Sequence, residues 1–576
     1  MKGDFKMNMK RILSLLLMLL MLVSTASAEI PAYLNVGKAP LVNEDITLRV
    51  AVMCHDNTTD PESTWFTHYL EEVLGLNIEL EYFYQATRDE NVALMMADGD
   101  LPDVMIGMNL TAAELTRYGM VDGLLLDIAP YLNEENAPNL MALAAEYPDY
   151  LQNLTNADGQ VFSIGSFVER DINNGIHRMF YNYDIMEAAG VEKCPTTLDE
   201  FMAMLRTIKQ YSDANNLGII PFGGNWARYN ATYLILNALG FNYSMDSTEQ
   251  KSHETEIALR NGEVTLICYD KEVFPKYLET MHAIYSEKLM EQDYYTLDKE
   301  TTKAHLAAGT YAVFSEKPFL YGGEEFGQQW WGGVPLTSEY NDTPFWCNYS
   351  DGYIGNYAIS AETEYPELCV ALADYLLGDE ARTLHAWGPS VNQPELLLGE
   401  SNGWYWDEEF GGRTYSDYME NKDAYQALQY YRFENIELWI ESGFRFIRVG
   451  DSSTDENGVS HAIDYNLAET DINEMAKLRH NEEMLGAVGF NYMMHNTWGR
   501  YVTSEISPKI CYFDEDTTLR ITELKTLIDQ YASQEIAKFI IGDRPLSEID
   551  DYFAELEKLG ADEYVKYYAD YYNAGK

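Results

Sequence analysis

Two hydrophobic patterns follow each other near the start of the chain and predict strands separated by helices. Residues 104–106 are an apolar run bounded by turn residues, residues 47–53 are mostly apolar and form the first expected strand, and residues 77–83 alternate between apolar and polar side chains. Residues 62–74 instead repeat apolar side chains at helical spacing. The resulting order of strand, helix, strand, helix and strand predicts a parallel sheet flanked by helices.

The second of these helices has clear end signals. Residues 91–98 are mostly apolar, Gly99 suits the position just past a helix end, and Pro102 prevents further helix before the next strand. Much later, residues 550–572 repeat large apolar and tyrosine side chains at helical spacing. We expect that segment to pack against a core and assign it no ligand role.

The first residues have the pattern of a secretion signal. Lys10 and Arg11 precede an apolar run at residues 12–23, and a small-residue cleavage pattern ends at Ala28. The run is shorter than the ~20 apolar residues that a membrane-spanning helix needs. We therefore predict a signal peptide at residues 1–28 and a secreted, extracellular or cell-surface protein. No cysteine precedes Cys54, so no lipid-anchoring cysteine is seen at the cleavage point.

The net charge limits the classes of partner. The formal charge of the chain is -54, and removal of residues 1–28, which carry four basic residues and one acidic residue, makes it -57. Such an acidic surface repels nucleic acid, anionic membranes and polyanionic ligands. We expect no nucleic-acid partner and a monomeric protein.

The signatures of catalysis and of metal binding are absent from the sequence. The six cysteines show no paired short spacing, and one disulfide of unassigned pairing stays open. No nucleophile elbow, phosphate-binding loop or dinucleotide-binding turn occurs. His253 and Glu254 begin like a zinc-protease motif, but Ile257 replaces the second histidine. We predict no enzyme activity, no cofactor and no metal.

Two loops resemble calcium loops only in part. Residues 213–218 lack the oxygen-bearing side chains that complete such a site, so we interpret them as a helix-ending turn. Residues 453–464 carry oxygen-bearing side chains at more of the expected positions. We interpret them as an acidic loop, with calcium as the open alternative.

Tryptophans beside glycine-rich turns are the strongest sign of a binding site. An indole ring can cover the apolar face of a sugar while neighbouring polar groups bind its hydroxyls. Packing in a core is the alternative for each ring taken singly. Such tryptophans stand at positions 226, 330, 331, 346, 387, 404 and 406.

Several segments, in order along the chain, resemble the family 1 extracellular solute-binding proteins of ABC importers. The first is the helix–strand segment at residues 91–107, with the strand and helix before it. The others are Leu-Asp-Ile-Ala-Pro-Tyr-Leu at 126–132, Ala-Pro-Asn at 137–139, Asp-Gly-Gln-Val-Phe at 158–162, Phe-Tyr-Asn-Tyr-Asp at 180–184, Ala-Gly at 189–190, Pro-Thr-Thr-Leu-Asp-Glu-Phe at 195–201, Lys-Phe-Ile-Ile-Gly-Asp-Arg-Pro-Leu at 538–546 and Leu-Glu-Lys-Leu-Gly at 556–560. The last two are similar to the closing helices of the large, oligosaccharide-importing members.

The resemblance implies a two-lobed α/β fold of the periplasmic-binding-protein type II, with mixed, mostly parallel sheets and a large helical C-terminal portion. The N-terminal lobe would comprise residues 29–170 and 305–355. The C-terminal lobe would comprise residues 171–304 and 356–576. Strand-like residues 310–314 and 352–360 would form the return to the first lobe and the last crossover.

The resemblance also implies a binding function without catalysis. The protein would capture a sugar, expected to be an oligosaccharide, between its lobes by hinge closure and deliver it to the permease subunits of an ABC transporter. From the aromatic and polar residues near turns and near the hinge, we expect ligand contacts from Trp226, Arg228, Trp330, Trp331, Trp346, Tyr353, Trp387, Trp404, Asp103 and Arg170.

Two alternatives stay open at this point. A secreted glycoside hydrolase would place two carboxylates around a sugar bond, and the abundance of acidic residues makes such pairs uninformative. A binding protein for a peptide or another non-sugar solute could use the same lobes.

Overall fold

The computed structural model places the chain in two compact units. Unit 1 comprises Met1–Ser166, Ile354–Ala381 and Glu441–Ile447, and unit 2 comprises Phe167–Tyr353, Arg382–Ile440 and Arg448–Lys576. The structure describes residues 30–574 with gaps at 55–59, 168–177, 227–228, 244–252, 316–317, 319–325, 348–353, 395, 397–402, 409–411, 415–454, 458, 460–470, 482–486 and 504–509.

Unit 1 is built on a mixed sheet in the order β11-β3-β1-β2. Strands β1 (Thr47–Cys54), β2 (Asn77–Tyr84) and β3 (Val104–Ile106) are parallel, and β11 (Tyr357–Ile359) runs antiparallel to β3. The interior strands β1 and β3 are almost wholly buried. The three parallel strands confirm the elements that the apolar runs predict.

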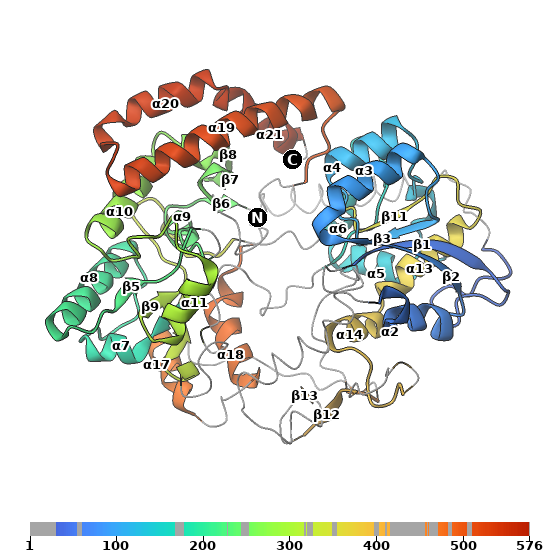
Figure 1. The fold of residues 1–576 in the computed structure, drawn as a ribbon, viewed down its shortest axis with the longest axis horizontal. Coiled ribbons are helices and arrows are strands. Elements are labelled where there is room, and N and C mark those ends of the chain that lie inside the picture. The colour runs from blue at the N-terminus through green and yellow to red at the C-terminus, as the bar shows by residue number, and fades with distance from the viewer. Residues whose placement is uncertain are drawn as a thin grey trace, which may run out of the picture. The chain divides into compact units, whose positions relative to one another are not determined.

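Helices cover both faces of this sheet, with α3 and α4 on one face and α2, α5 and α13 on the other (Figure 1). The helices of unit 1 are α2 (Trp65–His68), α3 (Arg88–Asp98), α4 (Ala112–Leu115), α5 (Pro138–Glu146), α6 (Pro148–Leu154) and α13 (Pro366–Leu376), with π-helical turns η2 (Tyr69–Val73) and η4 (Thr116–Val121) and 3-10 turns η1 (Pro61–Ser63), η3 (Gln85–Thr87) and η5 (Ala129–Tyr131). The predicted helix at 62–74 is thus a succession of 3-10, α and π turns.

Unit 2 contains a second mixed sheet in the order β10-β4-β9-β5. In it, β5 (Ile220–Phe222) is parallel to β9 (Tyr311–Phe314), whereas β4 (Phe180–Asn182) is antiparallel to both β9 and β10 (Trp330–Gly332). Two smaller antiparallel sheets complete the strands, formed by β6 (Asn242–Tyr243), β7 (Ile257–Arg260) and β8 (Glu263–Leu266), and by β12 (Tyr405–Asp407) and β13 (Gly412–Thr414).

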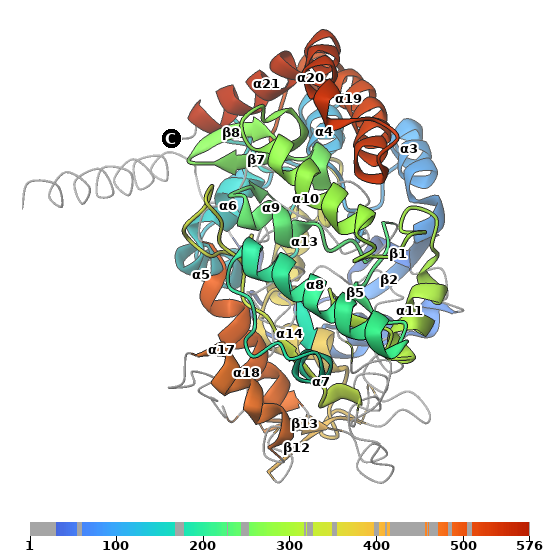
Figure 2. The same cartoon turned by 90° about the vertical axis from the view of Figure 1, so that its left-hand side faces the viewer.

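The remaining helices belong to unit 2 and extend to the C-terminus (Figure 2), except that α14 begins in unit 1 with Asp379–Ala381. They are α7 (Tyr183–Ala188), α8 (Leu198–Asn215), α9 (Tyr233–Ala238), α10 (Phe274–Ser286), α11 (Lys299–Ala307), α14 (Asp379–Trp387), α17 (Ile472–Ala476), α18 (Ala487–Thr497), α19 (Glu515–Ile541), α20 (Ile549–Lys558) and α21 (Ala561–Ala574), with 3-10 turns η7 (His253–Thr255), η8 (Ile267–Tyr269), η9 (Lys477–His480), η11 (Gly499–Tyr501) and η12 (Leu546–Glu548).

Helix ends follow the local sequence. Helix α3 ends at Gly99 with φ +79°, as its glycine predicts. Helix α8 begins with a capping box between Thr197 and Glu200 and ends before Asn216, which adopts a left-handed conformation. Residues 213–218 therefore form the predicted helix-ending turn.

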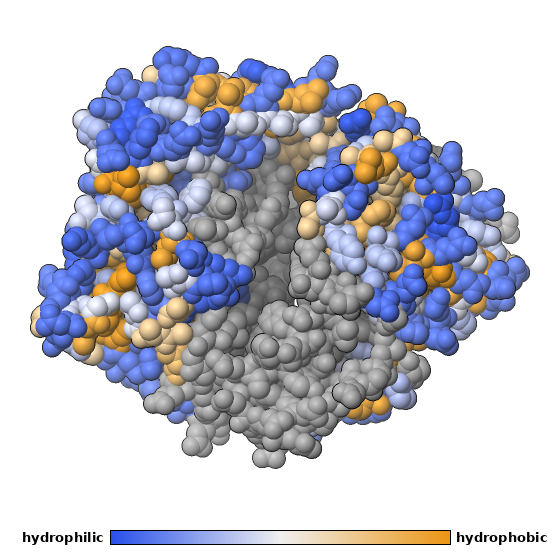
Figure 3. Space-filling view, viewed as in Figure 1, coloured by the Kyte–Doolittle hydropathy of each residue, from blue (hydrophilic) through white to orange (hydrophobic). Residues whose placement is uncertain are grey.

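The C-terminal helices belong to the core of unit 2. Helix α19 packs against α10, and α21 packs against β8. Tyr552, Leu556 and Tyr564 are buried, which confirms their predicted packing role. On the face drawn in Figure 3, the described residues are largely hydrophilic, with separate hydrophobic patches. No described helix combines the length and the apolar character needed to cross a bilayer.

The division of the chain differs from the predicted one in its middle part. Residues 305–353 lie in unit 2 instead of the first lobe, because β9 pairs with β4 and β5 of the unit 2 sheet. Residues 354–381 return to unit 1, where β11 pairs with β3. The two strands are correct as elements, but their assignment to the lobes is reversed.

Candidate functional site

The carboxyl ends of the three parallel strands share one edge of the unit 1 sheet, here called edge 1. Residues 107–109 follow β3 at this edge, and Asn356 reaches it just before the antiparallel β11. In open α/β sheets, ligands bind outside the carboxyl ends of the strands. We therefore expect ligand-binding groups at edge 1.

Asn109 is an exposed polar residue at edge 1, between buried Met108 and Leu110. Its backbone has φ +50°, a conformation that few residues other than glycine adopt and that asparagine tolerates best. Its side-chain Oδ1 accepts a hydrogen bond from Nδ2 of Asn356 at 3.1 Å. The remaining amide N–H groups of Asn109 have no acceptor among the described residues.

Gly355 fixes the backbone next to Asn109. The amide of Leu110 donates to the Gly355 carbonyl at 2.8 Å, and the amide of Gly107 donates to the Asn356 carbonyl at 2.7 Å. A Cβ added to Gly355 would lie 1.9 Å from the Leu110 oxygen, and its φ of +72° also favours glycine. The two segments therefore approach each other more closely than any side chain would allow.

The unit 2 sheet has a corresponding edge, here called edge 2, at the carboxyl ends of β5, β9 and β10. Phe314 and Gly332, the last residues of β9 and β10, both pair with Phe180, the first residue of β4. Residues 223–226 follow β5 at this edge.

The turn at residues 223–226 is tightly packed. A Cβ on Gly223 would lie 2.3 Å from the ring of Tyr311, and a Cβ on Gly224 would lie 2.3 Å from the carbonyl oxygen of Tyr229. Gly224 also has φ +136°. Both positions therefore require glycine, which explains the Gly-Gly pair in the sequence.

Trp226 is held at the end of this turn and is only partly buried. Its amide donates to the carbonyl of Tyr294 at 2.9 Å, and its ring lies 6.1 Å from the ring of Tyr295. The neighbouring Asn225 is buried and donates from Nδ2 to Oγ1 of Thr302 on α11 at 2.6 Å. The turn thus presents one indole from a fixed backbone.

Amide and indole groups bind a ligand without transforming it. An indole packs on apolar surface and an amide donates or accepts hydrogen bonds, but neither supplies a nucleophile or a general base. No group of three or more His, Cys, Asp or Glu side chains in the described ranges is arranged to hold a metal ion.

Comparison with known proteins identifies the family. The profile of the bacterial extracellular solute-binding protein family matches residues 57–383, more than half of the chain. The chain belongs to this family. Its members are non-enzymatic solute-binding proteins.

Known structures share the fold of this solute-binding protein. An extracellular solute-binding protein from Bifidobacterium longum subsp. infantis superimposes with a TM-score of 0.69 at 16% identity, covering 92% of this chain and 98% of that chain. The substrate-binding protein FusA of Streptococcus pneumoniae, in complex with kestose, gives a TM-score of 0.64 at 18% identity, covering 92% and 100%.

A curated relative with a similar sequence is the fructooligosaccharide ABC transporter substrate-binding protein FusA of Streptococcus pneumoniae serotype 4. It is 27% identical over 171 residues, which are 28% of this chain and 31% of that protein. The chain thus matches about a third of the length of this relative.

Four of the predicted ligand residues have packing roles in this solute-binding protein. Trp330 and Trp331 lie in β10 and are buried, and Trp346 is wholly buried with its Nε1 donating to the Thr497 carbonyl at 3.1 Å. Trp404 is buried, and its Nε1 donates to the Gly388 carbonyl at 3.0 Å. Ligand contact needs exposed indole surface, which these four side chains lack in this structure.

Asp103 lies at the amino end of β3, opposite edge 1. Its carboxylate accepts hydrogen bonds from the amide of Arg49 at 3.0 Å and from the hydroxyl of Thr363 at 2.7 Å. These bonds join β1, β3 and the segment after β11, so the structure gives Asp103 an internal role instead of the predicted one.

The structure describes only some of the other predicted ligand residues. Arg170, Arg228 and Tyr353 lie outside the described residues, and Trp387 ends α14 with a side chain that is not described. Of the predicted set, the structure places Trp226 alone as a described, solvent-accessible group at a carboxyl edge. Only residues 455–457 and 459 of the possible calcium loop are described.

The zinc-protease-like pair is internal. Burial lowers the pKa of His253 to about 4, so this histidine is neutral at pH 7. Burial also raises the pKa of Glu254, which accepts a hydrogen bond from the hydroxyl of Tyr277. The incomplete motif is correctly interpreted as no zinc site, but the polar sequence around it predicts a solvated histidine, and that prediction is wrong because both side chains are buried in unit 2.

Sequence reasoning did not identify Asn109. The signal was present: a single polar residue two positions after a strand-ending glycine, between apolar neighbours. Its side chain is made available by a left-handed backbone conformation, which the sequence pattern alone does not reveal.

Proposed function

We propose that this solute-binding protein captures an oligosaccharide and delivers it to the permease of an ABC importer. The observation that carries the proposal is the accessible indole of Trp226, fixed at the carboxyl edge of the unit 2 sheet by a two-glycine turn. A fixed aromatic face binds the apolar face of a sugar ring at little cost in conformational entropy.

The names of similar proteins support a sugar as the ligand. One relative is named for fructooligosaccharides. Of the similar structures, one is that of an HMO-binding, ABC-transporter-associated solute-binding protein from Bifidobacterium longum infantis, and another is that of an N-glycan transport solute-binding protein from Streptococcus pneumoniae. Their ligands differ, so they support the class of oligosaccharides and no particular sugar.

Hinge closure is the proposed mechanism. A ligand that touches groups of both units binds the closed form more tightly than the open form, and this difference in affinity drives closure. The permease would then recognise the closed, loaded protein. The predicted signal peptide places this step outside the cytoplasmic membrane.

The charge of the protein favours a neutral ligand. With a formal charge of -57 after residue 28, the protein repels anionic oligomers at long range. Asn109 adds a neutral hydrogen-bonding group at edge 1, which suits a hydroxyl-rich ligand.

The proposal is tested by titrating purified residues 29–576 with separate panels of neutral and uronic-acid oligosaccharides. Thermal unfolding and tryptophan fluorescence report binding, and chromatography of the recovered sugar reports cleavage. We expect a saturable rise in melting temperature with a neutral oligosaccharide, since a ligand at 100 times its Kd adds about 2.7 kcal/mol of stability. The sugar should be recovered intact.

Other outcomes distinguish the alternatives. Cleavage of the sugar would contradict the binding-protein proposal and favour a glycoside hydrolase. A response to peptides with none to any sugar would contradict the ligand class while leaving the family membership intact.

A further inference from the structure

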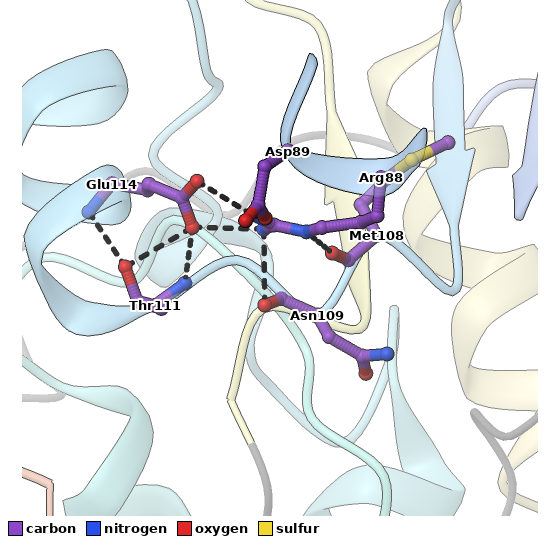
Figure 4. Close-up of polar contacts among 6 residues, drawn as sticks. All are labelled: Arg88, Asp89, Met108, Asn109, Thr111 and Glu114. Atoms are coloured by element: carbon purple, nitrogen blue, oxygen red, sulfur yellow. Dashed lines mark hydrogen bonds and ion pairs between the residues drawn. The ribbon is translucent and has the colours of Figure 1, made fainter. Parts of the chain in front are cut away.

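Arg88 links three segments of unit 1 around Asn109 (Figure 4). It is the first residue of α3, and its side chain is only 17% exposed. Its Nε donates to the carbonyl of Met108 at 2.8 Å, and Nη2 donates to the carbonyl of Asn109 at 3.2 Å. The guanidinium therefore binds two consecutive carbonyl oxygens of the segment that follows β3.

Glu114 binds the other side of the same guanidinium. Its two carboxylate oxygens accept from Nη1 and Nη2 of Arg88, each at 2.8 Å, in the fork geometry that suits arginine and not lysine. The carboxylate also accepts from the amide of Thr111 at 2.8 Å, as part of the capping box that begins α4. Glu114 thus connects Arg88 to the start of α4.

The backbone between these contacts is in a costly conformation. Asn109 has φ +50°, and such a conformation costs about 1 kcal/mol in a residue other than glycine. The hydrogen bonds from Arg88 hold the carbonyls of Met108 and Asn109, which lie on either side of the strained φ angle of Asn109. With its carbonyl turned toward Arg88, Asn109 directs its side chain away from the guanidinium (Figure 4).

The side-chain amide of Asn109 is fixed from its other end as well. Asn356 donates to its Oδ1, which leaves the Nδ2 hydrogens as donors at the exposed edge of the sheet. An oriented amide donor suits the hydroxyl and ring oxygens of a sugar.

We propose that Arg88 and Glu114 are positioning residues that hold the Asn109 amide as a hydrogen-bond donor to the ligand. The inference rests on the proposed function and adds to it a ligand contact at edge 1 and the pair that fixes it. Neither Arg88 nor Glu114 touches the ligand. Both act through the backbone of residues 108–111.

The test compares ligand affinities by isothermal titration calorimetry with the oligosaccharide that the panel identifies. Asn109→Gly keeps the left-handed backbone and removes the amide, so affinity should fall about 5- to 10-fold, the value of one hydrogen bond. Arg88→Lys loses the fork, and affinity should fall about 3-fold or more. The double variant should bind no more weakly than Asn109→Gly alone, because Arg88 acts through Asn109.

Arg49 provides a matched control at the opposite end of β3. Arg88 has a second carboxylate partner, the neighbouring Asp89, to which Nη1 donates at 2.9 Å. Arg49 likewise binds two carboxylates and has a carbonyl partner, with Nη1 donating to Asp100 at 2.8 Å and to the Leu101 carbonyl at 3.3 Å and Nη2 donating to Glu81 at 2.9 Å. Arg49→Lys should leave the affinity unchanged. Glu114→Gln is a milder change that keeps an oxygen for Thr111, so it serves if Arg88→Lys does not fold, and it should lower affinity about 2-fold.

The outcomes separate this inference from the proposed function. If the unmodified protein binds oligosaccharide but Asn109→Gly binds equally well, the inference is wrong and the function stands. Additive losses in the double variant would also overturn it, since Arg88 would then act independently of Asn109. If the unmodified protein binds no sugar, the proposed function fails first.

Discussion

At the scale of single residues, Trp226 is the side chain whose loss should affect binding most. We predict that Trp226→Ala lowers the affinity for the oligosaccharide at least about tenfold, because removal of an aromatic group at the centre of a binding surface costs about 2 kcal/mol or more. Its melting temperature should fall by less than in a variant of a wholly buried tryptophan, since the indole packs against the core of unit 2 but is only partly buried. Calorimetry and thermal unfolding measure the two effects separately.

Trp346 supplies the matched control. It is wholly buried, and its Nε1 binds the carbonyl of Thr497, so Trp346→Phe should lower the melting temperature without changing the affinity. A loss of affinity in Trp346→Phe comparable to that in Trp226→Ala would contradict the assignment of the two indoles.

A second prediction at this scale concerns Asp374 on α13 and the pH dependence of stability. Its carboxylate accepts from the amide of Leu140 at 2.8 Å and from Nδ2 of Asn139 at 3.1 Å, in the first turn of α5. Burial nevertheless raises the pKa of Asp374 to about 6, above its ordinary value of 3.8. In the folded protein the carboxyl keeps its proton at pH values where the unfolded chain has lost it.

The sign of the pH effect follows from this difference. The stability that Asp374 contributes is fully present below about pH 4 and is lost as the pH rises through about 6, a change on the order of 2–3 kcal/mol. Asp374→Asn removes the titration and keeps an acceptor oxygen. The difference in melting temperature between the parent protein and the variant, measured from pH 4 to 7, should shift in favour of the variant as the pH rises. A difference independent of pH would contradict the assignment.

At the scale of elements, helix α11 holds the turn that carries Trp226. Thr302 on α11 accepts the hydrogen bond of buried Asn225 and donates its own to the Asp298 carbonyl. Thr302→Val keeps the shape and removes both bonds, so we predict a loss of about 1–3 kcal/mol in the free energy of unfolding and a few-fold loss of affinity.

Thr207 on helix α8 provides the control for Thr302→Val. Thr207 is only partly buried, and the one hydrogen bond of its hydroxyl among the described residues is the local one to the Ala203 carbonyl. Thr207→Val should change the free energy of unfolding by less than about 0.5 kcal/mol and leave the affinity unchanged. Denaturant unfolding and calorimetry on both variants test whether the effect of Thr302 depends on its contact with the turn.

The sequence predicts elements well where the signals are local. The strands at 47–53, 77–83 and 104–106 and the helix that ends at Gly99 depend on apolar runs, glycine and proline, and the structure confirms them. The helix at 62–74 is less regular than predicted, because its π-helical turn η2 depends on packing and not on a local signal.

The candidate site, too, can be predicted from the sequence only where the signals are local. The two glycines before Trp226 mark a tight turn in the sequence, and the structure places an accessible indole there. The tryptophans at 330, 331, 346 and 404 also stand near glycines, yet their rings are buried. Which side of a strand or turn faces solvent depends on strands that pair from distant parts of the chain, and no local pattern records that pairing.

At the scale of the whole molecule, the assignment of segments to units is the least local property of all. The strand at 311–314 is a short apolar run with no mark of the sheet that it joins, and it pairs in unit 2. Residues 354–381 join unit 1 through β11. The two α/β units with mixed sheets and the helical C-terminal part, which the resemblance implies, agree with the structure. The expected mostly parallel pairing holds for the unit 1 sheet, whereas two of the three strand pairs in the unit 2 sheet are antiparallel.

The acidic charge makes a prediction at this largest scale. In the proposed mechanism, closure brings two acidic units together, and their repulsion opposes it. Salt shortens the range of this repulsion from about 30 Å at 10 mM to about 8 Å at 150 mM. We predict that the affinity for a neutral oligosaccharide increases about 2- to 3-fold over this range of salt.

Small-angle scattering provides the accompanying measurement, because closure around the ligand should reduce the radius of gyration at both salt concentrations. Replacing NaCl with KCl separates screening, which depends on ionic strength alone, from binding of a particular ion. A decrease of this affinity with salt would contradict the prediction, since screening of a repulsion between two acidic units can only favour closure around a neutral ligand.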